Sequence, residues 1–99
     1  MVLKRRLEGK VAIVTGASNG MGAAEAKLLA SEGARVVACD IQSAPGEEVV
    51  SEILAEGGEA EYVHCDVTSE KEWESVVEGT VSRYGALHVL VNNAGISST

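Results

Sequence analysis

Three glycines, Gly16, Gly20 and Gly22, lie between a short apolar run and a segment with helical periodicity. Gly16 allows a tight turn, Gly20 removes a Cβ where a phosphate would approach the backbone, and Gly22 permits close packing of the following helix. The N-terminus of such a helix offers free N–H groups and a partial positive charge to a diphosphate. A plain strand-to-helix turn can contain the same glycines. Their position between a buried strand and an amphipathic helix favours a dinucleotide site.

Asp40 is the second candidate, 24 residues beyond Gly16 and at the end of another apolar run. A carboxylate at this position accepts hydrogen bonds from both ribose hydroxyls of NAD and repels the 2′-phosphate of NADP. Positions 41–44 contain no Arg or Lys, and position 19 is Asn. A solvated Asp at a strand end is the alternative, but the pattern favours NAD as the cofactor.

The elements that would position these groups alternate along the chain. Short runs rich in β-branched residues predict strands, and the segments with 3.6-residue periodicity between them predict helices. The predicted strands span 10–15, Arg35–Asp40, 60–66 and 86–92, and the predicted helices span 21–31, 45–54 and 70–84. Strands joined by helical crossovers are almost always parallel. We therefore expect a single α/β domain over residues 1–99, a doubly wound parallel sheet with three crossover helices and the third strand near an edge.

Each predicted helix has an apolar stripe that we expect to face the sheet. The stripes consist of Met21, Ala24, Leu28 and Leu29; of Val49, Val50, Ile53 and Leu54; and of Trp73, Val76, Val77, Thr80, Val81 and Tyr84. Pro45 suits a first helical turn, and Ser69 with Glu72 forms a capping-box pair before the third helix.

Ligands of doubly wound sheets bind beyond the carboxyl ends of the strands. Asp66 and Val67 follow the third strand, and the run Asn92-Asn93-Ala94-Gly95 follows the fourth. By themselves these residues indicate only a loop and a turn.

Taken together, the four strand ends resemble the short-chain dehydrogenase/reductase family. The family's TGxxxGxG motif is matched from Thr15 to Gly22, and its NNAG motif is matched by residues 92–95. The Asp-Val pair at 66–67 and the lead-in at 7–10 also match. The resemblance covers essentially the whole chain and implies a Rossmann-type fold.

The resemblance also implies a set of cofactor-binding residues. In chain order they are Gly16, Ser18, Asn19, Gly20, Met21, Gly22, Asp40, Ile41, Asp66, Val67, Asn92, Ala94 and Gly95. Residues 18–22 would lie on the pyrophosphate and adenosine side, where Asp40 and Ile41 would hold and flank the adenosine. Asp66 would meet the adenine amino group, with Val67 against the ring. The last three residues would border the cofactor, and Asn93 would tie the final turn to the sheet.

No catalytic residue is assigned, because the family's catalytic Ser and Tyr-x-x-x-Lys pair come after the fourth strand. Neither tyrosine supplies that motif, since Tyr62 is followed four residues later by Asp66 and Tyr84 by His88. We expect the cofactor-binding half of an NAD-dependent oxidoreductase, a fragment without activity of its own in which the fourth strand leaves an unpaired, apolar edge of the sheet. The full-length protein would act on a small alcohol or ketone and form a homo-oligomer. The alternatives are an NAD-binding or association module without catalysis, and a non-functional truncated fragment.

Composition and charge limit the kinds of partner that we expect this protein to bind. The net charge of −7 argues against nucleic acid and anionic membranes as partners. No apolar run is long enough to cross a bilayer. Cys39 and Cys65 fit neither a metal site nor a disulfide framework, so we expect buried, reduced thiols in a cytoplasmic protein.

Overall fold

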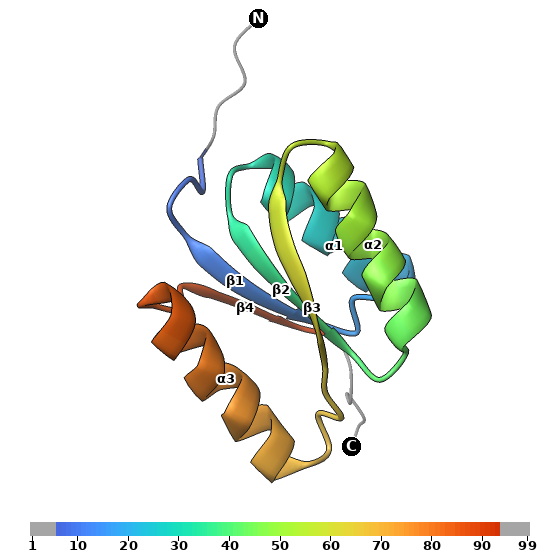
Figure 1. Ribbon diagram of the computed structural model, residues 1–99, viewed down its shortest axis with the longest axis vertical. Helices are drawn as coiled ribbons and strands as arrows, with labels where there is room; N and C mark the ends of the chain where they lie inside the picture. The colour runs from blue at the N-terminus through green and yellow to red at the C-terminus, as the bar shows by residue number, and fades with distance from the viewer. Residues whose placement is uncertain (1–5, 94–99) are drawn as a thin grey trace, which may run out of the picture.

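Four strands and three helices alternate along the chain (Figure 1), and the computed structural model describes residues 6–93. The elements are β1 Val11–Thr15, α1 Gly20–Ser31, β2 Arg35–Asp40, α2 Ser43–Ala55, β3 Glu59–His64, α3 Glu70–Tyr84 and β4 Val89–Asn92. The predicted α/β class and the predicted order of elements are both confirmed.

All the strands pair in parallel, in the order β3-β2-β1-β4. The first two crossovers place β2 and then β3 on one side of β1, and the third returns the chain to place β4 on its other side. Within residues 6–93, β3 and β4 are therefore the two edges of the sheet, as expected. Helices α1 and α2 lie together on one face, and α3 lies on the opposite face (Figure 1). The strand order thus reverses between β1 and β4, which is where doubly wound sheets bind ligands.

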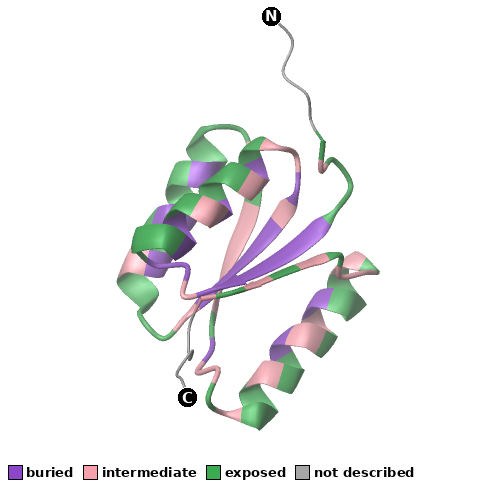
Figure 2. Cartoon of the chain, turned by 180° about the vertical axis from the view of Figure 1, so that it is seen from behind, coloured by how far each residue is buried: buried purple, intermediate pink, exposed green. Residues whose placement is uncertain are grey.

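The core has two layers, one on each face of the sheet. Alternate residues of β1 and β2 point to opposite faces, so Val14 packs toward α1 and α2, whereas Ile13 packs toward α3. Both central strands are almost entirely buried, and the outer faces of the helices are exposed (Figure 2). This burial on both faces explains why the strands read as continuous apolar runs.

The predicted buried face of α1 is wrong except at Leu29, which is partly buried against the core. Met21 is 71% exposed and Leu28 59% exposed. The face that contacts the sheet consists of small residues, namely Gly22, Ala23, Ala26 and Ala30. Because small side chains allow a helix backbone to lie closer to a sheet, close approach outweighs the burial of the larger apolar groups.

The other two helices bury most of their predicted stripes. In α2, Val49, Val50 and Ile53 are buried, whereas Leu54 is 53% exposed. In α3 the residues facing the sheet are buried or partly buried, and Val81 is 42% exposed.

Two strand boundaries differ from the prediction by more than one residue. Strand β3 ends at His64, because Asp66 leaves the ladder to form a turn in which Oδ1 accepts a hydrogen bond from Thr68 N at 3.0 Å. Strand β4 begins only at Val89, because the backbone amide of Val11 bonds to the side chain of His88 and not to a backbone carbonyl group. Val11 N donates to His88 Nδ1 at 3.0 Å.

The capping box before α3 forms in part. Ser69 Oγ accepts a hydrogen bond from Glu72 N at 3.2 Å, as predicted. The Glu72 carboxylate accepts from Asp66 N at 2.9 Å, and Ser69 N donates to the carbonyl oxygen of Asp66 at 2.9 Å. The cap therefore fixes the loop between β3 and α3 as well as the start of the helix.

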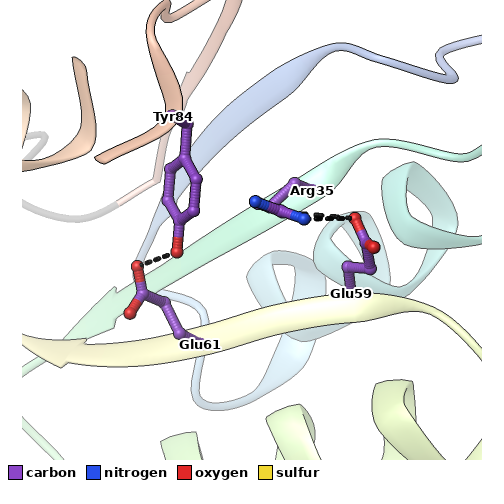
Figure 3. A network of polar contacts seen from close by, with 4 residues as sticks. All are labelled: Arg35, Glu59, Glu61 and Tyr84. Atoms are coloured by element: carbon purple, nitrogen blue, oxygen red, sulfur yellow. Dashed lines mark hydrogen bonds and ion pairs between the residues drawn. The ribbon is translucent and has the colours of Figure 1, made fainter. Parts of the chain in front are cut away.

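A polar network joins α3 to the sheet (Figure 3). Glu61 of β3 accepts a hydrogen bond from the Tyr84 hydroxyl at 2.7 Å. Arg35 of β2 pairs with Glu59 at 3.1 Å, and its guanidinium lies 4.6 Å from the centroid of the Tyr84 ring. Arg35 and Glu59 are the first residues of their strands, at the end of the sheet opposite the carboxyl ends where ligands of such sheets bind.

None of the helices described within residues 6–93 is long and apolar enough to cross a membrane.

Candidate functional site

An open cleft with a volume of about 550 Å³ lies beyond the carboxyl ends of the first three strands. Its lining residues are Gly16, Ser18, Asn19, Gly20, Met21, Gly22, Asp40, Ile41, Gln42, Cys65, Asp66, Val67, Thr68 and Asn93. All ten candidates from the glycine turn, the end of β2 and the Asp-Val pair are among them. The fold therefore brings these sequence-predicted residues to one place.

The glycine turn forms one wall of the cleft. Gly20 has a φ of +59°, and a Cβ at this position would have no neighbour within 4 Å, so the space above it is open to a ligand. Gly22 is needed for the opposite reason, because its Cβ would lie 1.9 Å from the carbonyl oxygen of Gly16. The N-cap residue Asn19 makes no side-chain hydrogen bond to α1, and the first turn of the helix contains no acidic residue. The helix N-terminus can thus receive an anionic group.

The carboxylate of Asp40 is held in one orientation by the residues around it. Oδ2 accepts hydrogen bonds from Ser18 N at 3.1 Å and from Ser18 Oγ at 2.6 Å. Oδ1 accepts from Ile41 N at 2.7 Å and from Gln42 N at 3.3 Å. Ser18 belongs to the glycine turn, so this pair links the turn after β1 to the end of β2.

These hydrogen bonds keep Asp40 ionised. Partial burial alone would raise the pKa of its carboxyl group, but hydrogen bonds from the Ser18 hydroxyl and from three backbone amides outweigh it and lower the pKa below its ordinary value. A negative charge therefore faces the cleft at neutral pH.

Asp66 provides a second carboxylate on the far side of the cleft. Its Oδ1 accepts from Thr68 Oγ1 at 2.6 Å, and this hydrogen bond is the main cause of a lowered pKa. Val67 follows it in the lining, so the loop after β3 contributes a carboxylate and an apolar side chain to the cleft.

The end of β4 is tied to β1 as the family resemblance implies. Asn93 N donates to Thr15 Oγ1 at 2.9 Å, and Asn93 Nδ2 donates to Glu25 Oε1 at 2.7 Å. Asn92 is not among the residues that line the cleft, since its Oδ1 accepts from Thr15 Oγ1 at 2.8 Å. The candidates Ala94 and Gly95 lie outside the described residues.

Four lining residues were not among the cofactor-binding candidates: Gln42, Cys65, Thr68 and Asn93, the last of which was expected only to tie the turn after β4 to the sheet. Gln42 and Thr68 directly follow chosen pairs, so extending each loop by one position would have found them. Cys65 and Cys39 are free, buried thiols in the same apolar cluster. Burial raises the pKa of the Cys39 thiol to about 12 and also raises that of Cys65. Both cysteines are therefore protonated at neutral pH, and their burial as free thiols is as predicted.

The charges of the cleft are entirely negative in the described part of the chain. Asp40 and Asp66 line it, and the lining contains no Lys or Arg. No group of three His, Cys, Asp or Glu residues arranged to hold a metal ion occurs among residues 6–93. The arrangement offers a helix N-terminus for a diphosphate and carboxylates for neutral hydroxyl or amino groups.

The reversal of strand order at β1, the glycine turn and the acidic residue after β2 together define a Rossmann-type nucleotide-binding fold. The sequence profile of the short chain dehydrogenases matches residues 10–99. The chain belongs to the short-chain dehydrogenase family, whose members bind nicotinamide dinucleotides.

Several similar proteins are named as reductases or dehydrogenases. The chain is 48% identical over 92 residues to a tropinone reductase-like 2 protein from Erythroxylum coca, which covers 93% of this chain and 32% of that protein. It is 45% identical over 95 residues to secoisolariciresinol dehydrogenase from Forsythia intermedia, covering 96% of this chain and 34% of that protein. The chain thus spans about a third of the length of the relatives it matches.

Solved structures agree with this fold. A metagenomic short-chain oxidoreductase in complex with NADP superimposes with a TM-score of 0.88 at 45% identity, over 92% of this chain and 41% of that one. A hydroxysteroid dehydrogenase from Escherichia coli gives a TM-score of 0.87 at 43% identity, over 93% of this chain and 39% of that one.

Proposed function

We propose that this chain is the cofactor-binding part of an oxidoreductase that uses NAD in preference to NADP. The full-length protein would transfer hydride between the nicotinamide and an alcohol or carbonyl group of a small molecule. The relatives named as reductases and dehydrogenases support this reaction class. The free, buried thiols support a reducing, cytoplasmic location.

The residues present fit the cofactor. The uncapped start of α1 beside Gly20 would hold the diphosphate, and the carboxylate of Asp40 would accept hydrogen bonds from the ribose hydroxyls. Asp66 and Val67 would meet the adenine. When bound, NAD supplies the hydride acceptor, and the residues described here bind and orient its adenosine half.

The single observation that carries the preference for NAD is the ionised Asp40 in a cleft whose described lining has no basic side chain. A 2′-phosphate would place about two further negative charges beside this carboxylate, with no Lys or Arg to offset them. The ribose of NAD presents only hydroxyl groups, which can donate hydrogen bonds to the carboxylate.

The test is titration calorimetry of the purified protein with NAD and with NADP. The wild type should bind NAD more tightly, and Asp40→Ala should weaken NAD binding by about tenfold or more, because a hydrogen bond to a charged group contributes about 1.5–3 kcal/mol. The affinity for NADP should stay the same or rise. Equal affinities of the wild type for the two cofactors would refute the proposal.

Asp66→Ala is the matched control, since it also removes a carboxylate from the cleft. The adenine that Asp66 would meet is common to both cofactors. This variant should therefore weaken NAD and NADP binding by a similar factor and leave their ratio unchanged.

A further inference from the structure

Tyr62 of β3 lies directly behind the residue that is proposed to select the cofactor. Its hydroxyl donates a hydrogen bond of 2.6 Å to the backbone carbonyl oxygen of Asp40. The same hydroxyl lies 3.4 Å from Ser43 Oγ, at the first residue of α2. The Tyr62 side chain therefore bridges the end of β2 and the start of α2.

The Tyr62 ring lies against Gly46, where the absence of a side chain leaves room for the ring. Gly46 is buried in the first turns of α2, and a Cβ there would lie 2.3 Å from Tyr62 Cε1. The ring also packs against the cluster formed by α1, α2 and the sheet. A ring seated in this way leaves its hydroxyl little freedom to move away from Asp40.

Asp40 is consequently held at both its side chain and its backbone. Ser18 donates to the carboxylate from the glycine turn. The Tyr62 hydroxyl of β3 donates to the carbonyl oxygen, which also accepts a hydrogen bond from Cys65 N at 3.1 Å. Only Ile41 and Gln42 separate Asp40 from α2, and both of their amides donate to its Oδ1. A shift of the Asp40 backbone would therefore change the position of the carboxylate and of both amides together.

We infer that Tyr62 is a positioning residue that sets the discrimination between NAD and NADP by holding Asp40 in place. The inference rests on the proposed function, because it concerns the same carboxylate. Tyr62 does not line the cleft, so it acts through Asp40 and not by contact with the cofactor. Preorganisation of this kind increases affinity only for the ligand that uses the oriented group.

The test compares Tyr62→Phe with the wild type in titrations with NAD and NADP. The variant keeps the ring against Gly46 and removes only the hydroxyl. Loss of one hydrogen bond that holds Asp40 should lower the ratio of NAD to NADP affinity about fivefold, with nearly all the change in NAD binding.

Gly46→Ala provides a second route to the same result, because the added methyl group would push the ring away and leave the hydroxyl intact. The ratio of NAD affinity to NADP affinity should fall in this variant as well. Tyr84→Phe is the matched control. It removes a similar tyrosine hydrogen bond, 2.7 Å to Glu61, from the network in Figure 3. It should lower stability and leave the ratio unchanged.

The outcomes separate this inference from the proposed function. A wild type without NAD preference would overturn the proposed function and the inference with it. A wild type with NAD preference, combined with an unchanged ratio in Tyr62→Phe or in Gly46→Ala, would overturn the inference alone. Equal weakening of NAD and NADP in Tyr62→Phe would do the same, because it would reveal a purely structural role.

Discussion

The close contact between Gly22 and the turn after β1 makes Gly22→Ala a sharp test of the site's geometry. A Cβ at residue 22 would lie 1.9 Å from the carbonyl oxygen of Gly16 and 2.7 Å from its carbonyl carbon. Because non-bonded carbon atoms rarely approach within about 3 Å, the helix or the turn must move by about 1 Å. Both clashing groups are backbone, so no rotation of a side chain can relieve the contact.

The expected cost follows from that displacement. Overpacking of a tight contact costs about 1–3 kcal/mol, and the higher helix propensity of Ala offsets about 1 kcal/mol at most. Because both clashing groups are backbone, the overpacking cost should lie at the upper end of that range, so we expect Gly22→Ala to lower the free energy of unfolding by about 2 kcal/mol. In a domain of this size each kcal/mol corresponds to a fall in Tm of about 4–8 °C. NAD affinity should fall too, since the displaced turn is a wall of the cleft.

Gly79→Ala in α3 is the control for helix propensity. Its Cβ would meet only the guanidinium end of Arg83, at 3.2 Å from Nη1, and this flexible group can move aside. The variant should gain up to about 1 kcal/mol in stability. Both variants can be compared by urea denaturation. A Gly22→Ala protein as stable as the wild type, with unchanged NAD affinity, would refute the reasoning.

Two further predictions concern groups in the layer between the sheet and α3. The buried Thr80 Oγ1 has no hydrogen-bond partner among the described residues, so Thr80→Val should raise the free energy of unfolding by about 1 kcal/mol. An unchanged or lower midpoint of urea denaturation would count against this. Burial raises the pKa of Cys39 from 9.0 to about 12, so the unfolded chain releases this proton first as the pH rises. The contribution of the Cys39 thiol to the free energy of unfolding should be fully present below pH 9 and should be lost as the pH rises toward 12. Cys39→Ala should make this fall in stability shallower. An identical alkaline profile for the two proteins would contradict the assignment.

The architecture and most of the candidate site could be predicted from sequence because they depend on periodicity and on residues at strand ends. Buried parallel strands give apolar runs of characteristic length, and Asp40 ends one of them while Asp66 lies two residues beyond the end of another. Parallel pairing then brings the strand ends to one edge of the sheet, so positions far apart in sequence meet in one cleft.

The features that escaped prediction depend on distances. Periodicity placed Met21 and Leu28 toward the sheet, but the close approach of α1 requires the small residues on the adjacent face. The hydrogen bond from the Tyr62 hydroxyl to the Asp40 carbonyl oxygen could not be predicted from sequence. It depends on the register of β3 against β2, and no sequence pattern marks that register. The end of β3 before Cys65 depends on an Asx turn that competes with the ladder, and local sequence does not decide that competition.

The central place of β1 has a consequence for how the chain assembles during synthesis. Thr15 bonds to Asn92 across a separation of 77 residues, whereas β1 meets β2 after a single helix. At a translation rate of about 5–20 residues per second, β1 waits about 4–15 s before its second neighbour leaves the ribosome. During that interval one side of the most apolar strand lacks a partner. Chaperone binding to nascent chains should therefore be strongest before residue 92 emerges and should decline once β4 pairs.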